Sequence, residues 1–151
     1  MVNAVPLQMD FCMNAPKKIL VVDDSPVWVE RLTAILKEIK NIGNISYAVT
    51  YNEAIEKMHA VKADIVLLDI SLPDKNGIDL IKVFRNEYPD TMVVMVTNFA
   101  DEFYRKLSKK LGANYFIDKS NEFEQIAEII EQGSKGLKIK EVKNHLDRDA
   151  S

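Results

Sequence analysis

Apolar and polar residues follow each other along the chain in blocks that predict an alternation of strands and helices. Short apolar, β-branched runs predict strands at 19–22, 45–49, 64–69, 91–97 and 115–117. After each run, apolar residues recur at helical spacing. Five strands alternating with five helices predict an α/β fold with an open, mostly parallel sheet covered on both faces, because right-handed crossovers place helices on either side.

Capping and helix-breaking residues predict where the helices begin and end. A cap, proline or glycine stands at a boundary of each periodic segment. The signals, in chain order, are Ser25 with Pro26 before the first helix, Asn52 before the second, Pro89 after the third, Asp101 and Gly112 around the fourth, and Ser120–Asn121 and Gly133 around the last.

Length and composition describe one globular domain with two short ends. A chain of 151 residues, 47% apolar and 28% charged, is typical of a single soluble domain. We expect a tail at 1–16, a folded domain at 17–132 and a mildly basic tail at 133–151. The ends leave no room for a second domain, so the chain is either a stand-alone domain or a fragment of something larger.

Charge and cysteine content exclude several classes of protein. Twenty basic and 23 acidic residues give a net charge of -3, which supplies no overall attraction for nucleic acid or an anionic membrane. The one cysteine, Cys12, cannot form an internal disulfide, and residues 1–16 do not resemble an export signal. No apolar run approaches the roughly 18 to 20 residues of a membrane span. We therefore expect a cytoplasmic protein.

Polar residues stand where the long predicted strands end. Asp23 and Asp24 follow the first strand, Asp69 ends the third, Thr97 ends the fourth and Lys119 follows the fifth. The carboxyl ends of parallel strands form the ligand-binding edge of an open α/β sheet. Clustered carboxylates repel each other unless a cation intervenes, and oxygen ligands suit Mg²⁺.

Together these side chains compose a phosphoryl-transfer site. Asp69, alone at the end of the most central strand, is the candidate nucleophile, and Asp23 with Asp24 would hold the metal. A lysine supplies a compact charge able to bind a phosphate oxygen. A single strand-end carboxylate is more often a helix cap, so the hypothesis depends on the whole set.

Four motifs in this order resemble the receiver domain of two-component response regulators. They are ILVVDDSP, IVLLDISLPDKNG, MVVMVTN and YFIDKS, and the resemblance covers about residues 17–132. It implies a CheY-like, flavodoxin-like doubly wound fold with five parallel strands in the order 2-1-3-4-5 and helices on both faces. Strands one and three are then neighbours at the switch point where ligands bind.

The resemblance also implies a role for each site residue. Asp69 would be the phosphoacceptor, Asp24 a direct Mg²⁺ ligand, Asp23 a ligand through water, and Ser71 a ligand through its backbone carbonyl. Thr97 and Lys119 would bind the phosphoryl oxygens.

The same resemblance implies a switch. On phosphorylation Thr97 would move toward the phosphoryl group and Phe116 would turn inward. The fourth helix, fifth strand and fifth helix would then present a new surface to a downstream protein. The phosphoryl group would come from a sensor histidine kinase, a phosphotransfer protein or a small acyl phosphate, and the domain would catalyse only its own phosphorylation and dephosphorylation. No DNA-binding output is expected in the chain itself.

Two other functions share part of this pattern. A phosphatase of the haloacid-dehalogenase type also uses an Asp nucleophile, a hydroxyl, a lysine and Mg²⁺, but it begins with a D-x-D strand end, and Asp69-Ile70-Ser71 does not fit that pattern. A phosphorylation-independent binding module is the third possibility. Retention of all five site residues speaks against it.

Two residues depart from the family pattern, and four others have expected positions or roles of their own. Ser120 follows Lys119 where many receivers have proline, and Asn98 follows Thr97 where a small residue is usual. Trp28 is expected to pack close to the metal site. Tyr104 is expected either on the output surface or as an ordinary surface aromatic residue. His59 and His145 are expected to bind no metal.

Overall fold

Five parallel strands form the centre of the molecule, a computed structural model that describes residues 15–134. The strands are β1 (Lys17–Val22), β2 (Ile42–Ala48), β3 (Ile65–Leu68), β4 (Met92–Thr97) and β5 (Tyr115–Asp118). Their order is β2-β1-β3-β4-β5, and every neighbouring pair is parallel. The predicted flavodoxin-like topology is confirmed.

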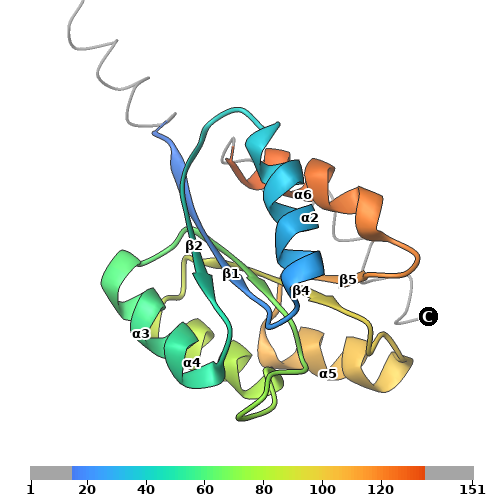
Figure 1. Cartoon of the computed structure of the whole chain (residues 1–151). Coiled ribbons are helices and arrows are strands. Elements are labelled where there is room, and N and C mark those ends of the chain that lie inside the picture. Colours follow the sequence, from blue (N-terminus) through green and yellow to red (C-terminus); the bar gives the residue numbers. More distant parts are fainter. Residues whose placement is uncertain (1–14, 135–151) are drawn as a thin grey trace, which may run out of the picture.

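Helices cover both faces of this sheet. They are α2 (Pro26–Lys37), α3 (Tyr51–Val61), α4 (Ile78–Glu87), α5 (Glu102–Leu111) and α6 (Ile126–Ser134), with a 3₁₀ turn η1 (Phe123–Gln125) before α6. Figure 1 shows α2 and α6 on one face and α3, α4 and α5 on the other. Within residues 15–134, no helix has the length and apolar character needed to cross a bilayer.

The strands are apolar because most of them are buried on both faces. All residues of β3 and β4 are buried, as are the last four of β1. Successive side chains point to opposite faces of a strand. Leu20 and Val22 therefore join the core beneath α3, α4 and α5, whereas Ile19 and Val21 join the core beneath α2 and α6. Alternation between two cores leaves no polar face on the central strands.

The cap of α3 was predicted at the wrong residue. The N-cap is Thr50, whose hydroxyl accepts a hydrogen bond from the Glu53 amide at 3.0 Å, and Asn52 lies inside the first turn. The Glu53 carboxylate accepts from the Val49 amide at 2.7 Å. This arrangement resembles a capping box, in which the Glu three residues after the N-cap binds the N-cap amide; here Glu53 binds the amide of Val49, one residue before the N-cap.

The last helix begins later than predicted and continues past its expected end. Asp118 accepts hydrogen bonds from the Ser120 amide at 2.8 Å and the Asn121 side chain at 2.9 Å, which holds this segment in a turn. The α-helix proper starts at Ile126 and includes Gly133. A Cβ at Gly133 would come within 2.7 Å of the Met92 side chain, so glycine lets α6 approach the amino-terminal edge of the sheet.

Three other predicted boundary signals lie at helix ends. Pro26 opens α2 behind Ser25, Asp101 caps α5 through the Tyr104 amide, and Gly112 closes α5 in the left-handed region at φ 114°. The expected tails, 1–16 and 133–151, lie almost entirely outside the described residues.

Gly77 allows the loop between β3 and α4 to fold directly against the end of β3. Its amide donates to the Ile70 carbonyl at 2.6 Å, and a Cβ at this position would collide with the Asp69 carbonyl oxygen.

We expect Gly77→Ala to lower the free energy of unfolding by about 1 to 3 kcal/mol, the usual cost of overpacking. Urea unfolding measures this change. Asn86→Ala, an exposed change on the same helix, is the control and should stay within about 0.5 kcal/mol of the parent; equal losses in both variants would contradict the prediction.

Candidate functional site

Strand pairing brings Asp23 and Asp69 to the same edge of the sheet. Val22 and Leu68 are register partners at the ends of β1 and β3, and the Asp69 amide donates to the Val22 carbonyl at 2.9 Å. The next residue of each strand is therefore a carboxylate beside another carboxylate. The strand order 2-1-3-4-5 implied that strands one and three are neighbours. The structure shows this, and Asp23 and Asp69 are therefore adjacent.

Lys119 completes a buried ion cluster from the far side of β4. Its Nζ donates to Asp23 Oδ2 at 2.7 Å and to Asp69 Oδ2 at 3.1 Å. All three residues are almost inaccessible, with exposed fractions of 3% for Lys119, 2% for Asp23 and 7% for Asp69. Neighbouring strands are about 4.8 Å apart, so a side chain from β5 needs the length of lysine to reach both carboxylates.

Burial dominates the electrostatics of Asp23. Desolvation raises the pKa of its carboxyl group above the ordinary 3.8, although hydrogen bonds from Lys119 and the Ser25 amide and the lysine charge pull it down. The Ser25 amide donates to Asp23 Oδ1 at 2.9 Å, and Ser25 itself makes no side-chain cap to α2. The start of α2 is thereby tied to the acid cluster.

The acid cluster can hold a metal ion. One carboxylate oxygen from each of Asp23, Asp24 and Asp69 lies within 4.8 Å of the others, with Asp24 exposed and the other two buried. Lys119 pairs with two of these three carboxylates, so an excess of negative charge remains when all are ionised. Oxygen donors of this kind fit a hard divalent cation such as Mg²⁺.

Thr97 and Ser71 lie at the same edge of the sheet. Thr97 is fully buried at the end of β4, and its Oγ1 accepts a hydrogen bond from the Phe99 amide at 3.1 Å. The Ser71 amide donates to Asp69 Oδ1 at 3.3 Å, and Ser71 forms an isolated bridge with Asn76. The roles assigned to the Thr97 hydroxyl and the Ser71 carbonyl stay predictions.

Phe116 is inside the core and lies under an arginine that sequence reasoning missed. It is fully buried, and the Arg105 guanidinium carbon is 4.8 Å from its ring centroid. Arg105 also donates to the Phe116 carbonyl at 3.3 Å and pairs with Glu122 at 3.2 Å. The sequence does contain a signal for this contact, because Arg105 occupies a position on the apolar stripe of its helix, next to Tyr104.

Trp28 lies against the site lysine. The Lys119 Nζ is 5.0 Å from the centroid of the Trp28 ring, which agrees with the expected packing near the metal site. Arg31 and Phe123 contact the same ring. The sequence places Trp28 and Lys119 far apart, and no pattern in it indicated this contact.

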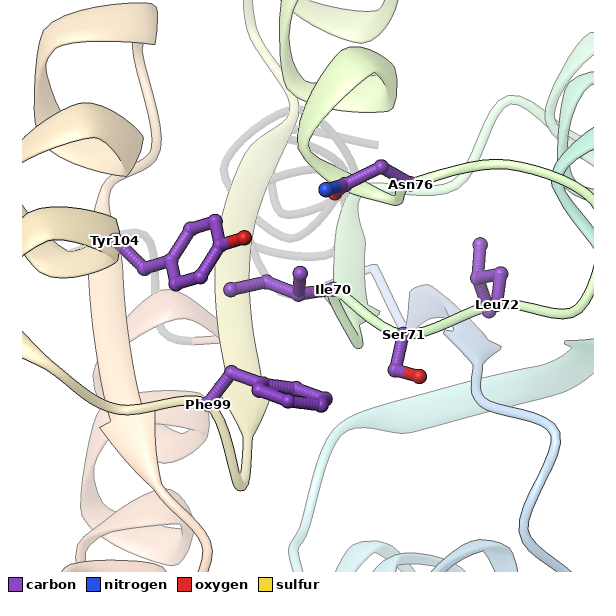
Figure 2. Close-up of a pocket in the computed structure, with 6 residues that line it drawn as sticks. All are labelled: Ile70, Ser71, Leu72, Asn76, Phe99 and Tyr104. Atoms are coloured by element: carbon purple, nitrogen blue, oxygen red, sulfur yellow. The ribbon is translucent and has the colours of Figure 1, made fainter.

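A pocket of about 230 Å³ lies beside the acid cluster but is not part of it. Figure 2 shows Ile70, Ser71 and Leu72 on the strand end and loop, with Ile70 directed toward the ring of Tyr104. Asn76 and Phe99 complete the lining, which contains no charged side chain. Tyr104 is partly buried and packs against the core, so it is not a plain surface residue.

The remaining expectations concern residues outside this edge. His59 is exposed and belongs to no metal-binding group among residues 15–134. The peptide bond after Lys119 is trans, because the described residues contain no cis peptide bond. Cys12 and His145 lie outside the described residues.

Comparison with known proteins finds one family and several relatives. The model of the family described as response regulator receiver domain matches residues 19–131. The DNA-binding transcriptional activator EvgA of Escherichia coli K12 is 30% identical over 125 residues, which are 82% of this chain and 58% of that protein. A protein-glutamate methylesterase/protein-glutamine glutaminase of Idiomarina loihiensis is 34% identical over 122 residues, covering 80% of this chain and 31% of that protein.

Solved structures agree with these relatives. The response regulator domain of Thermotoga maritima CheB superposes with a TM-score of 0.69 at 29% identity and covers 85% of this chain and 97% of its own. A LuxR-family response regulator from Aurantimonas sp. SI85-9A1 has a TM-score of 0.75 at 19% identity, covering 90% and 99% of the two chains. The second likeness shows the fold alone. This chain spans little more than half of EvgA, so the activity of such whole proteins does not transfer with the likeness.

The raised pKa of Asp23 predicts a pH dependence of stability. Between pH 3.8 and the raised pKa, folded Asp23 holds a proton that the unfolded chain releases, so this residue's contribution to stability falls as pH rises through that window. The free energy of unfolding of the parent minus that of Asp23→Asn should therefore decrease with pH there, in EDTA. Urea unfolding at several pH values measures it, with exposed Glu128→Gln as the matched loss of charge. A difference that increases with pH would contradict the assignment.

Proposed function

The chain belongs to the response regulator receiver domain family, and we propose that it accepts a phosphoryl group on Asp69 in a Mg²⁺-dependent reaction. The donor is a sensor histidine kinase or a phosphotransfer protein. The proposal places the receiver domain at residues 17–132.

One observation carries this proposal: the carboxylate that directly follows β3 lies beside both a lysine and two further carboxylates. Asp69 Oδ2 is 3.1 Å from the Lys119 ammonium, and Asp69 shares the metal-binding group with Asp23 and Asp24. A nucleophilic carboxylate needs an unprotonated oxygen and positive charge for the phosphoryl oxygens. Lys119 supports the second requirement, since its ammonium group lies beside Asp69 at the same edge of the sheet.

The chemistry is a transfer of the phosphoryl group between two oxygens or from nitrogen to oxygen. An Asp69 carboxylate oxygen attacks phosphorus, a new P–O bond forms, and the bond from phosphorus to the donor histidine nitrogen or acyl oxygen breaks. The donor leaves with the electron pair of that bond. Lys119 and the Thr97 hydroxyl would bind oxygens of the transferred group, because accepting from the Phe99 amide leaves the Thr97 O–H able to donate.

The proposed metal is held by this chain's own carboxylates. Asp24 would bind it directly, Asp23 through water, and Ser71 through its backbone carbonyl, with Asp69 as the shared ligand. When bound, Mg²⁺ supplies positive charge that offsets the phosphoryl oxygens and the carboxylates. Trp28, close to this site, would report binding through its fluorescence.

The signal would leave through the surface of α5, β5 and α6. Phe116 at the centre of this region is already buried, and Arg105 links α5 to Glu122 in the turn after β5. A phosphoryl group bound by Lys119 would act three residues from Phe116 in the same strand and turn. The target is a protein, since the net charge of -3 gives no overall attraction for nucleic acid or a membrane surface. The proposed location is the cytoplasm.

The phosphatase hypothesis has less support. The matched family is the response regulator receiver domain, the relative EvgA is a transcriptional activator, and the paired acids precede the nucleophile along the chain. We propose a signalling domain whose only catalysis is its own phosphorylation and dephosphorylation.

Phosphorylation of Asp69 can be tested by intact mass. We expect incubation with acetyl phosphate and Mg²⁺ to add one phosphoryl group to the parent protein and none to Asp69→Ala. Removal of Mg²⁺ with EDTA should lower the modified fraction at least about tenfold, because the phosphoryl charge then lacks its main counter-charge. Asp90→Ala, an exposed carboxylate change, is the control and should keep the adduct. Absence of an adduct in the parent, or an equal adduct in Asp69→Ala, would overturn the proposal.

Asn98 should influence how long the phosphoryl group persists. It is exposed next to Thr97, and its Oδ1 accepts a long hydrogen bond from the Ser120 hydroxyl at 3.5 Å. A polar side chain at this position can obstruct or steer the attacking water, so we expect Asn98→Ala to change the rate of dephosphorylation. The decay of the mass adduct after removal of the donor measures this rate. Ser120→Ala separates the effect of the hydrogen bond, and decay of Asn98→Ala at the parent rate would remove the idea.

A further inference from the structure

The ammonium group of Lys119 contacts an aromatic ring as well as two carboxylates. Asp23 and Asp69 accept its hydrogen bonds, while the Trp28 ring centroid lies 5.0 Å from Nζ. A cation within about 6 Å of an indole centroid is attracted by the ring quadrupole, and more strongly when water is excluded. Lys119 is 3% exposed, so this attraction acts with little screening.

The position of the Trp28 ring is itself fixed by a small stack. Phe123 lies 5.1 Å from the Trp28 ring at an interplanar angle of 57°, and the Arg31 guanidinium carbon is 4.6 Å from Trp28 and 4.7 Å from Phe123. Trp28 and Arg31 belong to α2, whereas Phe123 belongs to η1, four residues after Lys119. The stack therefore joins α2 to the segment that follows the site lysine.

The carboxylates and the ring differ in what else they must do. In the function proposed above, on which this inference rests, Asp23 and Asp69 also serve as metal ligands, and Asp69 loses a free oxygen when it is phosphorylated. Trp28 has neither task, and its attraction for a cation does not depend on the protonation or ligation of a carboxylate. The ring can hold the ammonium group at the site while both carboxylates are otherwise engaged.

We propose that Trp28 is a positioning residue for phosphoryl transfer, which keeps the Lys119 ammonium group directed at the acid cluster through its ring face. It acts through Lys119 and touches neither the metal nor the phosphoryl group. Loss of the ring would lower the rate of phosphorylation by about twofold to thirtyfold, the range expected from a cation–π contact.

The kinetic test compares two replacements of Trp28. The rate constant for adduct formation at saturating acetyl phosphate and Mg²⁺ is measured by intact mass for the parent, Trp28→Leu and Trp28→Phe. Leucine keeps an apolar side chain without a ring, and phenylalanine keeps a ring with a weaker quadrupole. We expect Trp28→Leu to be slow and Trp28→Phe to recover most of the rate. Val27→Ala, an exposed change beside Trp28 in the same helix, is the control and should match the parent.

A second test needs no phosphorylation. Trp28 is the only tryptophan of the chain, so all tryptophan emission comes from this ring. In EDTA, Lys119→Met should change the emission intensity or wavelength, because it removes the ammonium group from the ring and leaves the Arg31 guanidinium there. Lys75→Met is the matched control: Lys75 lies 4.8 Å from the Tyr51 ring, and its loss should leave tryptophan emission unchanged.

The outcomes separate this inference from the proposed function. If the parent forms no adduct, the proposed function fails and the emission test alone decides the contact. If the parent is phosphorylated but Trp28→Leu reacts at the same rate, or Trp28→Phe is as slow as Trp28→Leu, the positioning role is overturned. Equal emission in the parent and Lys119→Met overturns it as well.

Discussion

The buried ion cluster of Lys119 and two carboxylates is the constraint on which the rest of the structure depends. A lysine that is 3% exposed is tolerable only beside opposite charge, and its two partners are 96 and 50 residues away in the sequence. Bringing the three together requires β1 beside β3 and β5 within a lysine's reach across β4. The strand order, the apolar strands and the tight loop at Gly77 all serve that placement.

Sequence reasoning succeeded where the physical signal was local. The buried strands are apolar runs that end in Asp23, Asp69 and Thr97, and parallel strands must present those ends together. It failed where two local signals competed: Thr50 rather than Asn52 caps α3, because a Glu lies three residues after Thr50. Side-chain contacts such as those of Trp28 with Lys119 depend on packing across the sheet, and no periodicity in the sequence encodes them.

The described domain also carries an ion pair that is less deeply buried than that of Lys119 with Asp23. Arg105 and Glu122 join α5 to the turn after β5, and the Glu122 carboxylate also accepts from the Asp118 amide at 3.0 Å. Asp118 immediately precedes Lys119, so the residues that hold the site lysine and those that cover Phe116 share one short stretch of backbone. Charge at the sheet edge and the packing beneath α5 are therefore mechanically connected.

The path of α6 has a practical consequence for how the protein can be attached to other things. Gly133 lies against Met92 and Ile65, which begin β4 and β3, and β1 starts at Lys17 on that same amino-terminal edge. The described domain therefore begins and ends at the amino-terminal edge of the sheet (Figure 1), whereas Asp69 follows the carboxyl end of β3. An affinity tag, a surface anchor or a fused reporter joined at residue 15 or 134 would start at the far edge of the sheet, and a donor protein could approach the acids from the open side.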